Sequence, residues 1–403
     1  MLVQLSRHKP TKLVWIIISG AFLLLLLIAR ISRTDVASNF LSSSKSRPTR
    51  TGTMNETLGF QEIFVVNLPE RTDRRDGMIL ASALSGIKIE FIDAVKGQDI
   101  LDKALPPGGR GGMPEPNIGS WRGHMNAISD AKKLKLRPDI GRRLRLGYSN
   151  KGAIVRLFLS YTSSHPTPKK RSFEIRRFNY PKPKNGEELP KKTILYDDLP
   201  DTIEPLDSAY GDDWDLLWVG HCGMRFPGAG SPGDPAKIPK GRVIRSNDVT
   251  VPENHYLQTS AAFDIKAEYP DHTRGFHHVS DGICSLGYAI SQKGARSLLY
   301  YLGMLPFTHG FDVMLQQYCV DLAGKGYHKC LSTTPSLFEH HRPAGNMSYE
   351  SDISGHGDKV REKASTDNIR WSVRLNVKQL LDGGENMIDQ FPDTEPVEAK
   401  VDA

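Results

Sequence analysis

The chain has 403 residues, of which 38% are hydrophobic and 25% charged. These fractions are typical of globular proteins and exclude a fibre or a wholly disordered chain, and the length suits one large domain or two ordinary ones. The net charge of +7 arises in one segment, because residues 132–178 hold 14 Lys/Arg against 2 Asp/Glu (+12) and leave about −5 for the remainder. The basic character is therefore local and does not indicate a general nucleic-acid-binding surface.

Near the N-terminus, Leu13 to Ala29 is an uncharged apolar run that approaches bilayer-spanning length when it is extended to Ile31. We interpret residues 13–31 as a transmembrane signal-anchor, residues 1–12 as a cytosolic tail, and the Ser/Thr/Arg-rich residues 32–59 as a flexible stem. The alternative is a cleaved signal peptide, but the run has no clear small-residue cleavage site. The sequence thus predicts a single-pass type II membrane protein.

Two further features bear on a luminal location. Asn55-Glu56-Thr57 and Asn346-Met347-Ser348 are acceptor sequences for N-glycosylation, so Asn55 and Asn346 are candidate glycan sites. The four cysteines form no Cys-x-x-Cys pair, which disfavours a zinc site. They permit two disulfides in an oxidising lumen, with Cys319 and Cys330 the pair closest in sequence, or they are buried free thiols.

The folded part opens with Glu62–Leu68, a short apolar run ended by Pro69, which predicts a buried strand. A helical pattern then runs through Leu84, and residues 88–94 alternate like a second strand. This order indicates an α/β domain with a parallel sheet, in which ligands bind at the carboxyl ends of the strands. The arginines that follow the first strand, Arg71, Arg74 and Arg75, are placed there to meet a diphosphate; the alternative is a solvated helix start with surface ion pairs.

Five more elements are expected further along. They are a helix capped by Ser120, a strand over Trp214–Cys222 that ends at Gly220, a strand over Ile283–Ile290, a helix capped by Ser291 and a helix beginning at Phe311. Beyond about residue 345 the chain becomes polar, so we interpret residues 346–403 as a C-terminal tail whose acidic last dozen residues are disordered.

Five motifs together resemble one known family. They are Asn67–Arg75, Phe91–Val95, Gly119–His124, Trp214–Cys222 and Tyr288–Arg296. In this order and at these distances they resemble fungal members of glycosyltransferase family 25, which are related to collagen galactosyltransferases and bacterial lipopolysaccharide glycosyltransferases. Each motif is weak alone, but the set covers about residues 60–131 and 180–342.

The resemblance implies a GT-A-like nucleotide-binding α/β domain with a mostly parallel sheet over residues 60–345. It also implies a nucleotide-sugar donor, Mn²⁺, an inverting transfer to a hydroxyl of a glycan or glycoprotein, and a Golgi or endoplasmic reticulum membrane location. Donor contacts are expected from the first two motifs and the third, at Asn67, Arg71, Arg74, Arg75, Asp93 and His124. Asp312 is the candidate base or acceptor contact, with a helix-start aspartate favoured by the dipole as the alternative. A lone helical histidine such as His124 is also often a packing residue.

The acidic residues that would bind the metal are missing from the sequence. In the relatives, the segment after the third motif holds a strand ending in Glu-Asp-Asp and a nearby Asp-Trp-Asp, whereas here Ile140–Asn150 reads IGRRLRLGYSN. One codon choice for this string, read one base later, gives Leu-Glu-Asp-Asp-Ser-Asp-Trp-Asp-Ile-Arg. We therefore predict two compensating frame errors that bracket residues 132–178 and leave this block disordered or misfolded. Asp213 and Asp215 form an Asp-x-Asp, but they precede a strand, whereas a metal cluster should follow one.

Two other classes of function remain open from sequence. If the chain exists as printed, it is a catalytically dead GT-fold protein that binds a sugar or a partner. The basic block, with its interleaved aromatic residues, also imitates a nucleic-acid-binding patch, but it contains no known binding module and lies beyond the membrane anchor, so we expect no nucleic-acid partner.

Overall fold

The computed structural model describes residues 55–130, 153–155, 193–198, 210–211, 213–228, 238–324, 326–353, 355 and 357–394. The expected cytosolic tail and membrane anchor, most of the stem, and all of the basic block except residues 153–155 lie outside these ranges. Among the helices in these ranges, none combines the length and apolarity that a bilayer crossing requires.

The N-terminal elements follow the predicted order. Strand β1 (Ile63–Asn67) leads into helix α2 (Thr72–Leu84) and strand β2 (Glu90–Asp93), and β1 and β2 are parallel. Helix α3 (Glu115–Asp130) begins earlier than expected, so the prediction that Ser120 caps this helix is wrong. The missed signal is Pro116. In the first turn of a helix the N–H groups have no partner within the helix, so the missing N–H of proline costs nothing there, and its fixed φ suits the helix.

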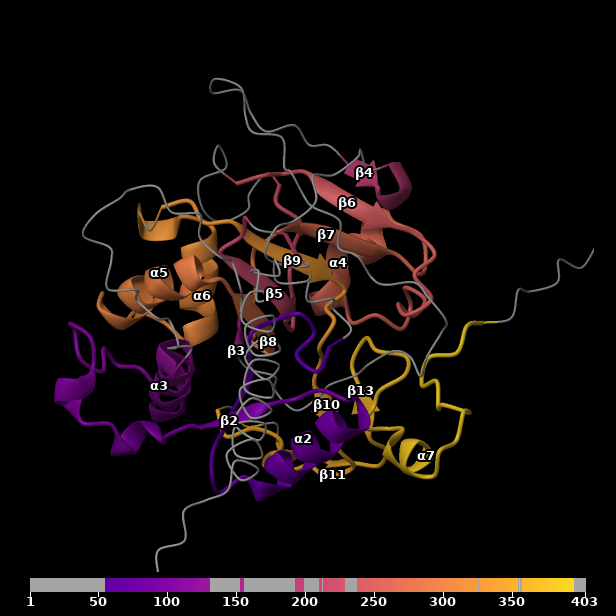
Figure 1. Cartoon of the computed structure of the whole chain (residues 1–403), viewed down its shortest axis with the longest axis horizontal. Coiled ribbons are helices and arrows are strands. Elements are labelled where there is room, and N and C mark those ends of the chain that lie inside the picture. Colours follow the sequence, from indigo (N-terminus) through magenta and orange to yellow (C-terminus); the bar gives the residue numbers. More distant parts are fainter. Residues whose placement is uncertain are drawn as a thin grey trace, which may run out of the picture. The chain divides into compact units, whose positions relative to one another are not determined.

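The remaining elements complete an α/β fold (Figure 1). The strands are β3 (Ala153–Val155), β4 (Thr193–Leu195), β5 (Leu216–Gly220), β6 (Arg242–Arg245), β7 (Arg274–His278), β8 (Gly287–Ile290), β9 (Cys330–Thr334), β10 (His341–Arg342), β11 (Gly345–Asn346), β12 (Val360–Arg361) and β13 (Ser365–Thr366). The α-helices are α4 (Thr259–Glu268), α5 (Gln292–Gly303), α6 (Phe311–Cys319) and α7 (Val377–Leu381). Short 3₁₀ turns are Gly97–Asp99, Asp102–Ala104, Tyr196–Asp198, Leu322–Gly324 and Met347–Tyr349.

The predictions for these later elements hold with adjusted bounds. The expected strand over Trp214–Cys222 is β5 and does end at Gly220, while that over Ile283–Ile290 is reduced to the four residues of β8. Ser291 caps α5 as predicted, because its Oγ accepts a hydrogen bond from the Gly294 N–H at 3.0 Å. Helix α6 begins at Phe311 as expected.

Nine strands of the described residues form one mixed sheet in the order β2-β1-β3-β8-β5-β9-β7-β6-β4. Only β7 and β8 run opposite to the other seven strands, but each lies between two of them, so four of the eight neighbouring pairs are antiparallel. We expected a mostly parallel sheet. Most strands do run in one direction, but only half of the neighbouring pairs are parallel. The carboxyl ends of seven strands share one edge, which we call the carboxyl edge.

Alternate residues of the strands fill two different cores, as the period of two requires. On one face, Phe64 and Val66 of β1 pack with Trp121 of α3 and with residues of α5 and α6; these three helices lie side by side in Figure 1. On the other face, Ile63 and Val65 pack with Met78 of α2. A third cluster lies under α4.

The four cysteines form the disulfides Cys222–Cys284 and Cys319–Cys330. Of the two alternatives left open by the sequence, the structure thus has the disulfides and no free thiol among its four cysteines. The first bridge joins the segment after β5 to the segment before β8, both at the carboxyl edge.

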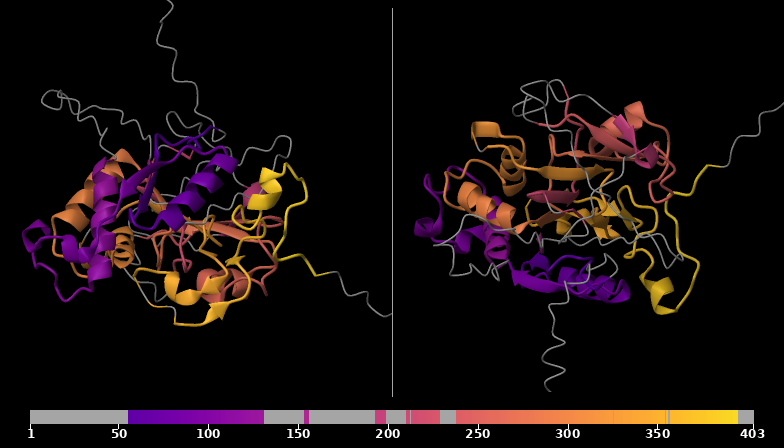
Figure 2. Two further views of the ribbon diagram at one scale, coloured as in Figure 1. Left: turned by 90° about the horizontal axis from the view of Figure 1, so that it is seen from below. Right: turned by 45° about the horizontal axis from the view of Figure 1, so that its top comes forward.

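Residues 346–394, which we set apart as a polar tail, continue the folded unit. Two short antiparallel pairs, β10–β13 and β11–β12, connect them to the segment after β9. Helix α7 lies beside α2 (Figure 2), and Thr366, Ser372 and Val373 are buried. Residues far apart in sequence therefore meet next to α2.

Candidate functional site

Polar side chains gather where the strands end at the carboxyl edge. Several of them are buried, which requires hydrogen-bonded or ionic partners, and in open α/β sheets this is the edge that binds ligands. The buried polar residues at or just beyond the strand ends are Asn67, His221, Asp248, Arg274, Ser285, Thr334, Ser336 and Glu339.

Asn67 shapes the turn from β1 into α2. It is the last residue of β1 and is 6% exposed, and its Nδ2 donates to the Leu68 carbonyl at 2.7 Å. The Arg71 N–H donates to the same carbonyl at 2.9 Å. The turn places Arg71 at the N-cap of α2, so its side chain and that of Arg74 start from the first helical turn.

Arg71 and Arg74 converge on one carboxylate. Asp352 Oδ2 lies 2.5 Å from Arg71 Nη1 and 2.8 Å from Arg74 Nη1. Arg71 also forms a two-bond pair with Asp73, at 2.9 and 2.8 Å, and this pair raises the pKa of Arg71. Burial lowers the pKa of Arg74, but an arginine stays charged at any physiological pH. The site thus presents two cations to a single anionic oxygen.

The segment that supplies Asp352 is held by further arginine contacts. Arg71 Nη2 donates to the Tyr349 carbonyl at 3.2 Å, and Arg74 Nη2 donates to the Glu350 carbonyl at 2.8 Å. The Glu350 side chain is 4% exposed and is ion-paired with Arg361 and, at 3.5 Å, with Arg342. Residues 349–352 therefore cover the start of α2.

Arg75 and Asp93 lie together, apart from that convergence. Arg75 Nη1 is 3.3 Å from Asp93 Oδ1, and the guanidinium lies over the Phe91 ring at 4.2 Å. Asp93 is exposed at the end of the outer strand β2, and Arg75, on α2, is partly exposed. The structure brings together Asn67, Arg71 and Arg74 of the predicted donor contacts, and it pairs Arg75 with Asp93.

His124 lies in the core between α3, β8 and α6. It is 0% exposed, its Nδ1 is 2.8 Å from the Tyr288 hydroxyl, and its Nε2 is 3.1 Å from Ser285 Oγ. The imidazole also stacks on Phe311 at a centroid distance of 3.7 Å. These contacts give His124 a packing role and use both ring nitrogens.

Asp312 fixes the segment before β8. Its Oδ2 accepts from the Cys284 N–H at 2.9 Å and its Oδ1 from the Val313 N–H at 3.0 Å. Cys284 has a positive φ of 61° and is bridged to Cys222. The Asp312 carboxylate thus stabilises an unusual backbone conformation at the carboxyl edge.

Glu339, which the sequence did not single out, is buried beyond the end of β9. Its Oε1 accepts from Ser336 Oγ at 2.5 Å and from Asn368 Nδ2 at 2.8 Å. Burial raises the pKa of Glu339 to about 8, so the carboxyl group is protonated over much of the neutral range. The available signal was a charged residue soon after a strand. Asp352 carried no such signal, because it lies in a polar segment far from any long strand.

Both glycan-acceptor asparagines are exposed. Asn55 Oδ1 accepts from the Thr57 N–H and hydroxyl at 3.1 and 3.2 Å, and Asn346 Oδ1 accepts from the same groups of Ser348, each at 2.9 Å. The hydroxyl of each acceptor sequence therefore faces its own asparagine.

The residues that follow β3, one of the two strands next to β1, do not fit a catalytic metal. Strand β3 pairs with β1 and β8, so three residues of the basic block are ordered within the sheet, but in sequence it is followed by Arg156 and not by acidic residues. The Asp-x-Asp is at the opposite edge: Asp215 Oδ1 lies 2.9 Å from Lys293 Nζ, and Asp213 is ion-paired with Lys329. Within the described ranges, Glu253, His272 and Asp393 form a group that could hold a metal ion.

No family model, curated protein or solved structure with which the chain was compared matches it.

Proposed function

We propose that this chain is a glycosyltransferase of the family 25 kind, with GT-A architecture, that takes a nucleotide-sugar donor and a hydroxyl acceptor on a glycan or glycoprotein. The observation that carries the proposal is the convergence of Arg71 and Arg74 on one oxygen of Asp352 beside the end of β1. Guanidinium groups at a helix start and a strand end are suited to a diphosphate.

In this proposal, Asp352 stands where an anionic oxygen of the donor would bind. The leaving group of a sugar-nucleotide transfer is a nucleoside diphosphate, whose negative charge two arginines stabilise. Asn67 holds the turn that positions both arginines, and Asp312 is a positioning residue for the segment at Cys284, because backbone N–H groups engage both of its oxygens.

Mn²⁺, when bound, would supply further positive charge to the departing diphosphate. In the sequence, β3 is followed by RLFLSYTSSH, which contains no acidic residue, and we therefore assign no metal ligand near the arginines. A second candidate function follows from this lack of acids: the chain binds a sugar nucleotide without turnover.

The disulfides and the exposed acceptor sequences support a luminal location in the Golgi or endoplasmic reticulum. Disulfides persist in oxidising compartments, and the chain has two of them. We propose a type II topology in which residues 13–31 are the anchor, with the membrane as a further partner and no nucleic acid.

Nucleotide binding tests the proposal without requiring turnover. Titration of the full chain with uridine and guanosine diphosphates should give saturable binding to one of them, and Arg74→Ala should weaken it at least about 10-fold, the typical result of losing a charge-assisted contact. Arg75→Ala is the matched control, because its side chain pairs with Asp93, and it should bind normally. Equal affinity of folded Arg74→Ala and the parent chain would overturn the assignment of this site, and retention on DNA that salt abolishes would favour the nucleic-acid alternative.

A further inference from the structure

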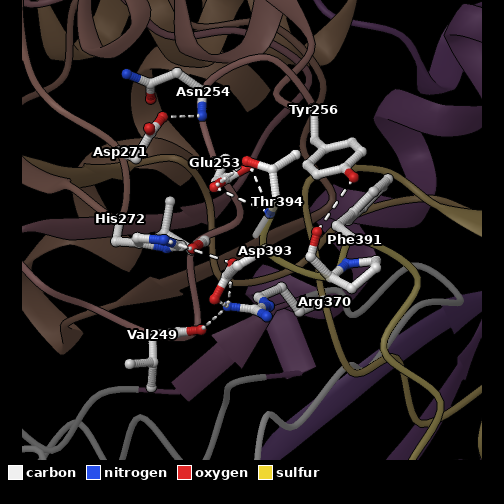
Figure 3. Close-up of polar contacts among 12 residues, drawn as sticks. Val249, Glu253, Asn254, Tyr256, Asp271, His272, Arg370, Phe391, Asp393 and Thr394 are labelled. Carbon is white, nitrogen blue, oxygen red and sulfur yellow. Dashed lines mark hydrogen bonds and ion pairs between the residues drawn. The ribbon is translucent and has the colours of Figure 1, made fainter. Parts of the chain in front are cut away.

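A second cluster of functional side chains lies at the carboxyl edge beside β6 and β7 (Figure 3). It combines Glu253 from the segment after β6, His272 from just before β7, and Asp393 near the end of the described chain. One ligand atom from each residue lies within 4.8 Å of the other two. Four strands separate β1 from β7 in the sheet, so the cluster lies roughly 20 Å or more from Asn67.

The imidazole of His272 is set in the tautomer that a metal requires. Its Nδ1 donates to the Val251 carbonyl at 2.7 Å, because a carbonyl oxygen can only accept. In the neutral ring Nε2 then carries the lone pair, and it faces Asp393 Oδ1 at 3.5 Å. A hydrogen bond that fixes the second nitrogen is the usual arrangement at metal-binding histidines.

The separation of these two atoms suits a shared ion better than a direct contact. A distance of 3.5 Å is long for a hydrogen bond, whereas two ligand atoms about 2.1 Å from a tetrahedral zinc ion lie about 3.4 Å apart. The third ligand, Glu253, lies above His272 and Asp393 in the view of Figure 3. The three residues thus supply one imidazole nitrogen and two carboxylates.

The charge around the cluster is negative even after its ion pairs are counted. Four carboxylates lie here, those of Glu253, Asp271, Asp389 and Asp393. Arg370 pairs with Asp389 and Asp393, and His255 Nδ1 lies 3.5 Å from Glu253 Oε2. Arg370 binds Asp389 at 2.5 Å and the Val249 carbonyl at 3.2 Å, and its Nη1 lies between the two oxygens of Asp393, at 2.9 and 3.2 Å. Nη1 is nearer to Oδ1, the oxygen that faces His272, than to Oδ2. A carboxylate oxygen has two lone pairs, so Oδ1 can accept from Arg370 and still bind an ion.

Glu253 is also oriented by its neighbours. The Thr394 hydroxyl donates to the carboxylate at 2.9 Å, and the Thr394 N–H lies 3.2 Å from Oε1. Each carboxylate oxygen has two lone pairs, so these bonds leave acceptor capacity for a metal. The hydrogen bonds from Thr394 therefore orient the Glu253 carboxylate and still allow it to bind a metal ion.

From this geometry we propose that Glu253, His272 and Asp393 bind one divalent cation of the zinc class. A mixed nitrogen and oxygen set favours such an ion over Ca²⁺ or Mg²⁺, which prefer oxygen ligands alone. The ion would fasten the segment at Phe391–Thr394 to the two segments that flank β6 and β7. The site is independent of the proposed transferase function.

Metal uptake by the chelator-stripped full chain tests the proposal. In equilibrium dialysis against micromolar Zn²⁺, the parent chain should retain one more equivalent of zinc than His272→Gln, in which affinity at this site should fall at least about 100-fold. Zinc should raise the melting temperature of the parent but not that of the variant. His309→Gln, which changes an exposed histidine outside the cluster, should retain the parent's zinc content.

Two more variants separate a metal site from a hydrogen-bonded latch. Asp393→Asn changes the most exposed ligand, which provides a second test if His272→Gln fails to fold, and it should also lose the extra equivalent. Thr394→Val removes a hydrogen bond to Glu253 but no ligand, and should still take up zinc. If folded Asp393→Asn binds as much zinc as the parent, or the folded parent takes up none at this site, the proposal is wrong.

Discussion

Asp352 Oδ2 lies 2.8 Å from Arg74 Nη1, and the same oxygen also binds Arg71. A carboxylate of the chain itself therefore binds both of the arginines that we propose as contacts of the donor diphosphate. If a diphosphate binds there as we propose, it displaces Asp352, and this competition lowers its affinity.

This relationship predicts that Asp352→Asn binds nucleoside diphosphate more tightly than the parent. Partly exposed ion pairs contribute up to about 1 kcal/mol, so the gain should be about fivefold. Asp93→Asn is the control, because it changes an aspartate that pairs with Arg75 outside the convergence. Unchanged or weaker binding by Asp352→Asn would show that Asp352 does not compete with the ligand.

Restoring the missing acids should restore turnover. A variant that carries Leu-Glu-Asp-Asp-Ser-Asp-Trp-Asp in the frame-corrected block should split a sugar nucleotide in the presence of Mn²⁺. The reason is that a divalent cation held by the restored acids would stabilise the leaving diphosphate. The printed chain should bind the nucleotide without turnover. The matched control replaces the restored aspartates by asparagine and should be inactive.

The donor screen for that variant should include several sugar nucleotides, each with and without chelator. A restored chain that is folded, binds nucleotide and splits none of them contradicts the transferase assignment. Turnover by the printed chain at an equal rate would instead contradict the frame hypothesis.

Glu339 predicts a specific pH dependence of stability. Because burial raises its pKa from 4.5 to about 8, the folded chain keeps a proton that the unfolded chain releases above about pH 4.5. The folded state thus binds more protons than the unfolded state. The contribution of Glu339 to the free energy of unfolding is complete below pH 4.5 and falls as pH rises towards 8, by up to about 1.4 kcal/mol per pH unit.

Urea unfolding of the parent chain and of Glu339→Gln between pH 5 and pH 8 measures this effect. The difference in free energy of unfolding between the two should shift in favour of the glutamine variant as pH rises, since glutamine cannot ionise. Glu90→Gln, at an exposed position of β2, should leave the pH profile as it is. Parallel profiles for the parent and Glu339→Gln would refute the raised pKa.

Glycosylation tests the orientation of the chain in the membrane. Expression in eukaryotic cells should give two N-linked glycans, at Asn55 and Asn346, because both side chains are exposed and would lie in the lumen. Asn55→Gln and Asn346→Gln should each remove one endoglycosidase-sensitive shift on a gel. A parent chain that carries no glycan, although it is inserted in the membrane, would place the domain on the cytosolic side.

Local patterns in the sequence were sufficient for much of the fold. The apolar run at β1, the pattern of α2 and the cap of Ser291 on α5 depend on residues within a few positions of each other, and each formed as predicted. The same local reasoning failed at Ser120, because the helix begins at Glu115 and has a proline, Pro116, in its first turn. It also placed Asn67, Arg71 and Arg74 at the carboxyl edge, because the first strand and helix of an α/β domain fix which loop reaches that edge.

Only the tertiary structure decided which distant groups meet. Asp352 binds Arg71, Cys222 pairs with Cys284, and His272 faces Asp393, and no local periodicity encodes any of these contacts. The placement of His124 in the core also depended on its partners from β8 and α6. Charge, burial and tautomer at these positions are set by neighbours that come from other segments, and the order of strands in the sheet determines those neighbours.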